Sequence, residues 1–407
     1  MLVSLITINP RINGWNESSR MALTQSLVEQ QSFSIDKSVF VDGGDKVFIE
    51  GHFYSDKPPI PSMLGALVYA PLYSAGLTLD FGWNLSYYLI ILFTVKAFWI
   101  ASVLAFYRAL QFTGIRKDQK NLVLLLYTLA SLSFSWSATF NNHSLAGSSL
   151  MIAFLFYLQA KHQSHKQALF WSGFFFGLAA SMDIPTGVFL LGFGILIIYR
   201  DRMRIQSLWF LAAALIPLSI HTVINYSIGG TLLPLQIIPE FFIFEGSVWD
   251  KSTALSGVRL NSALFSLKYA FLCLFGPSGF VWYNPLLLLL IPVMIRIIRR
   301  GGPFKREALV ILLGSFILMA YYFVSSSNFG GWSYSIRWFV PLLPLIGFFL
   351  HAVDLKGQTK WRKYILVVLI TIAIPIAVIG LVNPWSNPDI YPIPLMANLK
   401  QLLGILL

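Results

Sequence analysis

The residues best suited to chemistry lie in one polar segment, residues 16–59, of a chain that is otherwise strongly apolar. This segment opens with N-E-S-S-R, from Asn16 to Arg20. A carboxylate such as that of Glu17 can take a proton from a hydroxyl or amine nucleophile, or hold a divalent cation against a phosphate. The apolar spacing of residues 18–29 predicts a helix on a membrane surface. The structural alternative for Glu17 is an acidic residue in the first turn of that helix, where the helix dipole favours it.

The same segment closes with D-K-P-P, from Asp56 to Pro59. Because proline is tolerated in the first turn of a helix, the motif predicts a helix start directly after Lys57. The ammonium of Lys57 and the free N–H groups of that helix can bind a phosphate together. The alternative is an interfacial Asp–Lys pair that extends its charges toward water.

Composition identifies the class of protein. The chain has 407 residues, of which 56% are hydrophobic and 11% charged, whereas soluble domains carry about 25% charged residues. Its repeated apolar runs match the roughly 20 residues needed to cross a bilayer. The sequence therefore predicts a polytopic helical membrane protein. The single cysteine, Cys273, excludes an internal disulfide and a cysteine metal cluster, and its apolar surroundings predict a buried thiol.

Basic clusters between the apolar runs predict the topology. They hold most of the Lys and Arg residues and only four acidic ones, and enrichment of Lys and Arg in short loops marks the cytoplasmic side. The net charge of +12 is thus a topology signal, and we expect no nucleic-acid partner. The clusters are Arg116, Lys117 and Lys120; Lys161 and Lys166; Arg200, Arg202 and Arg204; Arg296, Arg299, Arg300, Lys305 and Arg306; and Lys356, Lys360, Arg362 and Lys363.

The predicted fold is one all-α domain, residues 1–407, with about 11 transmembrane helices. Residues 1–12 are too few for a comfortable span, so we expect either a short, tilted first helix or the last part of what is normally a longer one. The alternation of loops makes residues 13–80 a first outer loop, in which residues 61–80 form a helix lying on the surface. Residues 227–279 form a second outer loop with a re-entrant stretch at 263–275. The remaining predicted spans are 87–110, 120–138, 144–160, 167–182, 185–199, 206–225, 280–296, 307–325, 334–353 and 363–382.

Further polar residues are predicted on the same outer side. Asn142 and His143 begin a membrane helix, and His143 can contact a sugar or a metal, or simply cap the helix. Asp183 lies between two closely spaced helices, where it can contact substrate or cap the second helix. Tryptophans near helix ends, Trp385 among them, are expected in the interfacial aromatic belt, although some can stack on a sugar.

The order of these motifs resembles the bacterial GT-C glycosyltransferases, the protein O-mannosyltransferase-like and aminoarabinose-transferase-like membrane enzymes. In that superfamily an acidic motif, often Asp-Glu, opens the first outer loop, and D-K-P-P closes it. Residues 331–344 also look like the signature G-x-S-x-x-x-R-[YW]-x-x-P-x-x-P, with Arg337 as its arginine. The resemblance covers nearly the whole chain in helix order, and it depends on the order of the motifs because each one is short.

The resemblance implies transfer of a sugar from a polyprenyl-phosphate donor to a lipid, glycan or protein acceptor, by inverting displacement at the anomeric carbon. Glu17 matches the second acid of the opening motif and would act as the catalytic residue. Lys57 and Arg337 match residues that would bind the donor phosphate. Asn16 replaces the first acid of the motif and cannot act as a base. Further substrate-binding candidates are Asn16, Arg20, Asp56, Asn142 and His143, and a divalent metal, if one is used, would bind at Glu17 and His143.

Two other function classes stay open. Transporters and lipid flippases usually place ionisable residues in mid-membrane and often contain internal repeats. Here no repeat is evident, and Lys96 and His221 are the main midspan polar residues, which favours an enzyme acting at the outer face of the plasma (inner) membrane. Because Asn16 replaces an acid, a catalytically inactive relative that serves as an assembly subunit is the third class.

Overall fold

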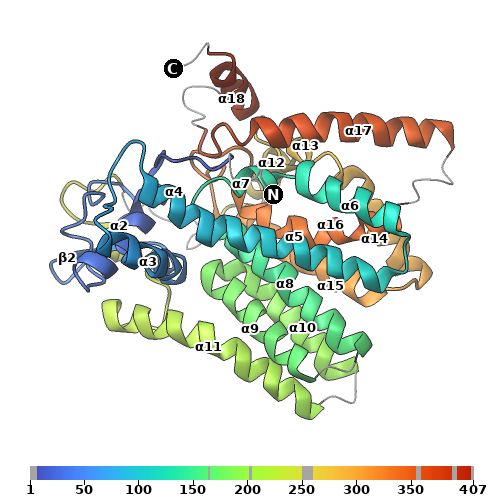
Figure 1. Ribbon diagram of the computed structural model, residues 1–407, viewed down its shortest axis with the longest axis horizontal. Coiled ribbons are helices and arrows are strands. Elements are labelled where there is room, and N and C mark those ends of the chain that lie inside the picture. Colours follow the sequence, from blue (N-terminus) through green and yellow to red (C-terminus); the bar gives the residue numbers. More distant parts are fainter. Residues whose placement is uncertain are drawn as a thin grey trace.

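The computed structural model describes residues 7–163, 166–200, 204–249, 260–353, 359–386 and 392–404. Long helices run lengthwise through the molecule, and α2, α3 and a small hairpin lie together at one end (Figure 1). The α-helices in the first half are α2 (Trp15–Glu29), α3 (Pro59–Ser74), α4 (Leu85–Ile91), α5 (Ala97–Ala109), α6 (Lys117–Leu129), α7 (Leu132–Trp136), α8 (Asn142–Gln163), α9 (Lys166–Met182) and α10 (Gly187–Arg200). Those that follow are α11 (Arg204–Gly229), α12 (Ala263–Phe275), α13 (Phe280–Tyr283), α14 (Leu287–Arg300), α15 (Lys305–Ser325), α16 (Leu343–Gly347), α17 (Lys360–Ile379) and α18 (Pro394–Leu402).

Short helical turns complete the described elements. A π-helical turn, η1 (Leu92–Lys96), joins α4 to α5 without a break. The 3-10 turns are η2 (Leu110–Thr113), η3 (Ile184–Thr186), η4 (Leu235–Ile237), η5 (Pro239–Phe242), η6 (Arg337–Leu342) and η7 (Phe348–Ala352).

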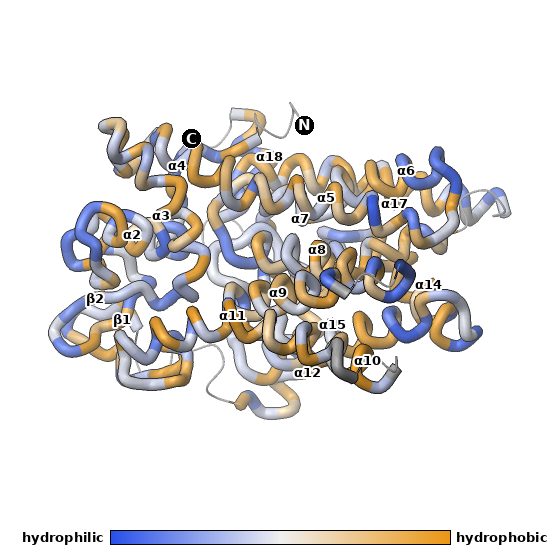
Figure 2. Tube along the Cα trace, turned by 60° about the horizontal axis from the view of Figure 1, so that its bottom comes forward, coloured by the Kyte–Doolittle hydropathy of each residue, from blue (hydrophilic) through white to orange (hydrophobic). Residues whose placement is uncertain are grey.

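The prediction of an all-α polytopic membrane fold is confirmed. Five described helical stretches are long and apolar enough to cross a membrane: Leu85–Thr113, Asn142–Gln163, Ser207–Gly229, Ala263–Tyr283 and Lys305–Ser325. Four shorter apolar helices accompany them: Gln167–Met182, Ile184–Tyr199, Arg337–Ala352 and Lys363–Ile379. Hydrophilic residues gather toward the two ends, around α2 and the hairpin at one end and around α6 and α14 at the other (Figure 2).

Three predicted spans are interrupted rather than continuous. Residues 120–138 form α6 and α7 with a break at Ala130 and Ser131, and residues 280–296 form α13 and α14 around Asn284 and Pro285. The two breaks meet, because the side chain of Asn284 accepts a hydrogen bond from the backbone N–H of Leu132 at 3.1 Å. The stretch predicted at 334–353 becomes helical only at residue 337, as η6, α16 and η7. Interruptions of this kind are tolerated where neighbouring helices supply the missing backbone partners.

Close packing of α9 on α11 depends on two glycines spaced four residues apart. A Cβ atom on Gly173 would lie 2.0 Å from the carbonyl oxygen of Phe210, and one on Gly177 would lie 2.3 Å from that of Ala214. No side chain fits at those distances. The G-x-x-x-G spacing therefore lets the two backbones touch, as in many membrane helix pairs.

The hairpin was not predicted from the sequence. Strands β1 (Lys46–Ile49) and β2 (His52–Ser55) pair antiparallel, with Lys46 opposite Ser55. Glu50 and Gly51 form the two-residue turn and both have positive φ, 50° and 88°, as type I′ turns require. The hairpin therefore brings residues 45 and 56, which lie just outside its paired ends, close together.

Both helices expected in the first outer loop, residues 13–80, are present, with corrections to the bounds of one and the position of the other. The second of them, α3, was predicted over residues 61–80; it begins two residues earlier, at Pro59, and ends at Ser74. Helix α2 does not lie on a surface, because its residues from Asn16 to Ser26 are buried. It packs against α3, where the hydroxyl of Ser62 donates to the carbonyl oxygen of Arg20 at 3.0 Å.

The two remaining predictions concern the first helix and residues 263–275. Residues 1–6 lie outside the described part of the chain, and the described residues 7–12 are not helical. Residues 263–275 form the helix α12, and their re-entrant course stays a prediction.

Candidate functional site

The start of helix α8 supplies two of the candidate residues. Asn141 caps this helix, because its side-chain oxygen accepts a hydrogen bond from the backbone N–H of Ser144 at 2.7 Å. Asn142 and His143 follow in the first turn and are buried. The cap is therefore Asn141, and His143 is available for a different contact.

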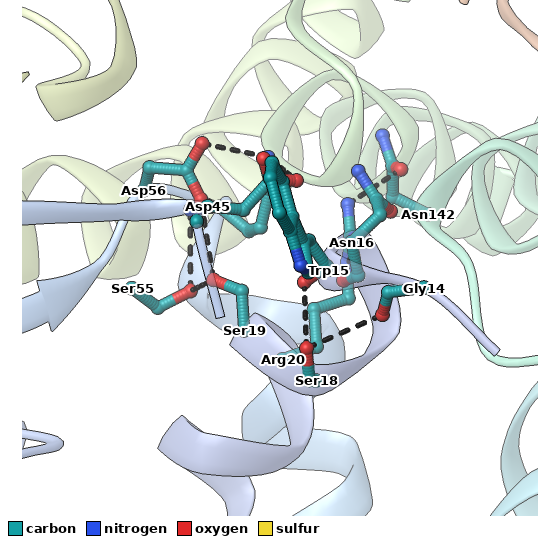
Figure 3. A network of polar contacts seen from close by, with 12 residues as sticks. Gly14, Trp15, Asn16, Ser18, Ser19, Arg20, Asp45, Ser55, Asp56 and Asn142 are labelled. Atoms are coloured by element: carbon teal, nitrogen blue, oxygen red, sulfur yellow. Dashed lines mark hydrogen bonds and ion pairs between the residues drawn. The ribbon is translucent and has the colours of Figure 1, made fainter. Parts of the chain in front are cut away.

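Arg20 joins helix α2 to helix α8. Its Nη1 donates to the backbone oxygen of Asn16 at 2.8 Å and also to the Asn16 side chain, while Nη2 donates to the side chain of Asn142 at 2.7 Å (Figure 3). Asn142 in turn donates to the carbonyl oxygen of Met182 at 3.1 Å. The structure thus brings the predicted residues Asn16, Arg20 and Asn142 together, and Asn16 positions an arginine.

Lys57 lies between two carboxylates. Its Nζ is 2.6 Å from Oδ2 of Asp56 and 2.8 Å from Oδ2 of Asp45, which the hairpin brings close together. The other oxygen of Asp56 accepts from Ser19 on α2 at 3.2 Å, and Ser19 also contacts Ser55 of β2 at 2.8 Å. Figure 3 shows the side chains of Ser19, Ser55 and Asp56 meeting between α2 and the hairpin. Lys57 is therefore already neutralised by its neighbours.

Glu17 is enclosed in a separate set of contacts. It is 0% exposed, and its Oε2 accepts the backbone N–H of Asn13 at 2.8 Å. Its Oε1 accepts the hydroxyls of both Tyr87 and Thr139. Burial raises the pKa of Glu17, and these donors oppose that rise. The contact with Asn13 ties down the start of α2, so the structural interpretation of Glu17 has direct support, while its catalytic role stays a prediction.

Arg337 is the basic residue with an open guanidinium. It is half-buried at the start of η6, and its Nε is buried without a hydrogen-bond partner. Its Cζ lies 4.9 Å from the ring centroid of Trp385, a cation–π contact. Within the described residues this guanidinium makes no hydrogen bond and no ion pair. It is therefore the cation best able to accept an anionic ligand.

The charged side chains of the site shift one another's pKa values. Burial and the neighbouring Arg337 lower the pKa of Arg20 to about 10, against the opposing effect of Asp56 and Asp45. Burial alone would raise the pKa of Asp45, but Lys57 holds it below its usual range, assisted by the two arginines. Burial raises the pKa of Asp56 despite the same lysine. The site is thus an array of basic and acidic groups that are buried or partly buried.

His143 and Asp183 form a buried pair beside this array. Nδ1 of His143 lies 2.7 Å from Oδ2 of Asp183, and both side chains are nearly fully buried. The predicted capping role of Asp183 is wrong for its side chain, because no capping hydrogen bond is made to η3. The carboxylate is directed to the imidazole instead.

A divalent metal at Glu17 and His143 stays a prediction. Glu17 and His143 make their contacts to different partners. Across the described ranges no group of three or more His, Cys, Asp or Glu side chains is arranged to hold a metal ion. We therefore derive no step that uses a metal.

Sequence reasoning missed Asp45 and the site role of Trp385. Alternating residues around Glu50-Gly51 are a hairpin signal that would have placed Asp45 opposite Asp56. Trp385 was expected in the interfacial belt, yet it is 2% exposed, and its indole N–H donates to Thr139 at 2.9 Å. No local pattern in the sequence signals that contact.

Comparison with known proteins identifies the fold. No family model matches the chain, and no curated protein matches it in sequence. Among solved structures, ArnT from Cupriavidus metallidurans in the apo state superposes with a TM-score of 0.55 at 14% identity, over 99% of this chain and 73% of that one. The same protein bound to undecaprenyl phosphate gives 0.54 at 14% identity, over 99% and 74%. The chain therefore shares the overall fold of ArnT.

Proposed function

We propose that the protein is a membrane glycosyltransferase that takes a sugar from a polyprenyl-phosphate donor and transfers it to an acceptor. The observation that carries the proposal is the open guanidinium of Arg337, which lies within electrostatic range of Arg20 and of the two acids that bind Lys57. A guanidinium matches the geometry of a phosphate and can bind it through two parallel hydrogen bonds. The fold shared with ArnT, which binds undecaprenyl phosphate, supports a lipid-linked phosphate as the ligand.

In the proposed reaction the acceptor displaces the phosphate from the anomeric carbon with inversion. The leaving phosphate gains negative charge as the bond breaks, and Arg337 and Arg20 stabilise it there. Lys57 adds positive charge from the start of α3, although Asp45 and Asp56 reduce its effect. Asn142 keeps Arg20 in place.

We further propose that this site faces the outer side of the plasma membrane. The loops rich in Lys and Arg, between α5 and α6 and between α14 and α15, lie at the end of the molecule opposite α2 and α3 (Figure 1). Positive loops face the cytoplasm. The orientation would give the site access to donors carried in the outer leaflet.

The test uses purified protein in proteoliposomes with synthetic undecaprenyl-phosphate-linked pentoses and hexoses, and an extract of envelope lipids and glycans as acceptor. We expect covalent transfer of one of these sugars, and a loss of about 100-fold or more in Arg337→Ala. Arg116→Ala is the matched control, since Arg116 is an exposed arginine paired with Asp118 in a basic loop. Unchanged transfer in Arg337→Ala would contradict the proposal. Movement of the lipid across the bilayer without a covalent product would identify a flippase. If the wild-type protein shows neither transfer nor lipid movement, the result would favour an assembly subunit.

A further inference from the structure

The buried pair of His143 and Asp183 has a feature that the proposed phosphate site does not use. Helix α8 presents His143 in its first turn, and the chain between α9 and η3 presents Asp183. They meet through Nδ1 of the imidazole at 2.7 Å. Nε2 of His143 makes no hydrogen bond to any described residue. Asp183 therefore holds Nδ1 of the imidazole, and Nε2 is available for a further hydrogen bond.

This arrangement determines the tautomer of the imidazole. A carboxylate that accepts a hydrogen bond from Nδ1–H leaves the lone pair on Nε2. Imidazoles oriented in this way by an aspartate act as general bases in several unrelated enzymes. Asp183 does not cap η3, so the contact with His143 is the side-chain interaction that explains its position.

The pair also lies beside the groups that would bind the donor. Asn142, the residue before His143, binds Arg20 at 2.7 Å. Both Arg20 and Arg337 act electrostatically on the imidazole, and Asp183 acts on both arginines. A phosphate bound by the arginines would therefore leave its sugar close to the first turn of α8.

Glu17 is less suited to take a proton from an acceptor. Its Oε1 already accepts two hydroxyls, which use both lone pairs of that oxygen. The whole residue is 0% exposed, whereas His143 retains 5%. A base must reach the proton it removes, and this requirement favours His143.

We propose that His143 is the general base of the glycosyl transfer and that Asp183 positions it; this inference rests on the proposed function. Nε2 of His143 removes the proton from the acceptor hydroxyl as its oxygen forms a bond to the anomeric carbon. The bond from that carbon to the phosphate oxygen breaks, and its electron pair leaves with the polyprenyl phosphate. His143 then releases the proton to water or to the departing phosphate, so that atoms and charge balance.

The experiment compares His143→Gln, His143→Gly and Asp183→Asn in the proteoliposome assay with the same undecaprenyl-phosphate sugars. We expect His143→Gln and Asp183→Asn to lower kcat by about 10²–10⁴-fold, the usual contribution of a general base, with KM for the donor changed less than about threefold. Asp183→Asn is informative because asparagine keeps the shape but removes the negative charge that stabilises the protonated imidazole, and its NH2 group can donate to Nδ1, which moves the proton to Nε2. Added imidazole should restore a measurable part of the activity of His143→Gly, which a purely structural role would not allow.

His52→Gln is the matched control, since His52 pairs with Asp36 at 2.6 Å on the exposed hairpin. Wild-type transfer with kcat unchanged in His143→Gln would overturn the inference while leaving the proposed function intact. So would a loss that appears mainly as a raised donor KM and is not rescued by imidazole in His143→Gly. No covalent transfer by the wild-type protein would instead overturn the proposed function itself.

Discussion

The guanidinium of Arg337 lies over the ring of Trp385, with 4.9 Å between Cζ and the ring centroid. The indole N–H of the same tryptophan donates to Thr139 at 2.9 Å, and Thr139 donates to Glu17. One aromatic side chain therefore connects the open cation of the site to the buried acid at the start of α2. This connection explains why a residue far along the chain is buried among residues of the first polar segment.

Two substitutions of Trp385 distinguish its cation–π contact with Arg337 from its hydrogen bond to Thr139. Trp385→Ala removes the cation–π contact, which is worth about 0.5–2 kcal/mol, and we expect the affinity for undecaprenyl phosphate to fall about 2–30-fold. Trp385→Phe keeps a ring below Arg337 and should retain most of that affinity. Binding of undecaprenyl phosphate, titrated by calorimetry, measures the difference. Trp209→Ala, at an exposed position of α11, is the control, and equal affinities in Trp385→Ala and wild type would contradict the prediction.

Removing one of the two acids around Lys57 should strengthen phosphate binding. Asp45→Asn leaves Lys57 with Asp56 as its single charged partner, which raises the positive potential seen by an anion. We expect tighter binding of undecaprenyl phosphate in Asp45→Asn and weaker binding in Lys57→Met, both reduced at high salt. Asp36→Asn is the control, because Asp36 lies earlier in the same loop and pairs with His52 instead of Lys57. Weaker binding in Asp45→Asn would show that Asp45 supports the phosphate site in another way.

Glu17 should contribute strongly to stability. In Glu17→Ala the donors Asn13, Tyr87 and Thr139 lose their acceptor in a buried place, and each unsatisfied group costs about 1–3 kcal/mol. We expect a clear fall in the thermal unfolding temperature, smaller in Glu17→Gln because the amide keeps one acceptor oxygen. Thermal unfolding in detergent, monitored by tryptophan fluorescence, measures the change in unfolding temperature. An unchanged unfolding temperature in Glu17→Ala would show that the enclosure of Glu17 is not structural, and would leave its predicted catalytic role as the better explanation.

The contact between α9 and α11 should not tolerate larger residues. Gly177→Leu places a side chain where even a Cβ atom would lie 2.3 Å from a backbone oxygen, so the helices must separate. Overpacking of this kind costs about 1–3 kcal/mol or more, and we expect a lower unfolding temperature and poorer recovery after detergent extraction. Gly302→Ala is the control because a Cβ there meets only an ordinary contact at 3.8 Å. Equal stability of the two variants would contradict close backbone packing.

The fold was largely predictable because hydrophobic length and loop charge are local properties of the sequence. The break between α13 and α14 at Asn284 could not be predicted, because it depends on the backbone N–H of Leu132 in α7, which only the folded bundle brings close. Within the site, the polar residues of the first loop were found from their motifs, and the structure brings Asn16, Arg20, Asp56 and Lys57 close together. The pairing of His143 with Asp183, and of Trp385 with Arg337, joins distant segments and has no local signal.

The position of Trp385 also bears on how the protein is made. The segment carrying Glu17 and Arg20 leaves the ribosome early, but Asn142 must follow before Arg20 has its second partner. Thr139 receives its indole donor only once residue 385 has been added. The hydrogen bond from Trp385 to Thr139 therefore forms only after nearly all of the chain has been synthesised, and the contact of Trp385 with Arg337 forms with it.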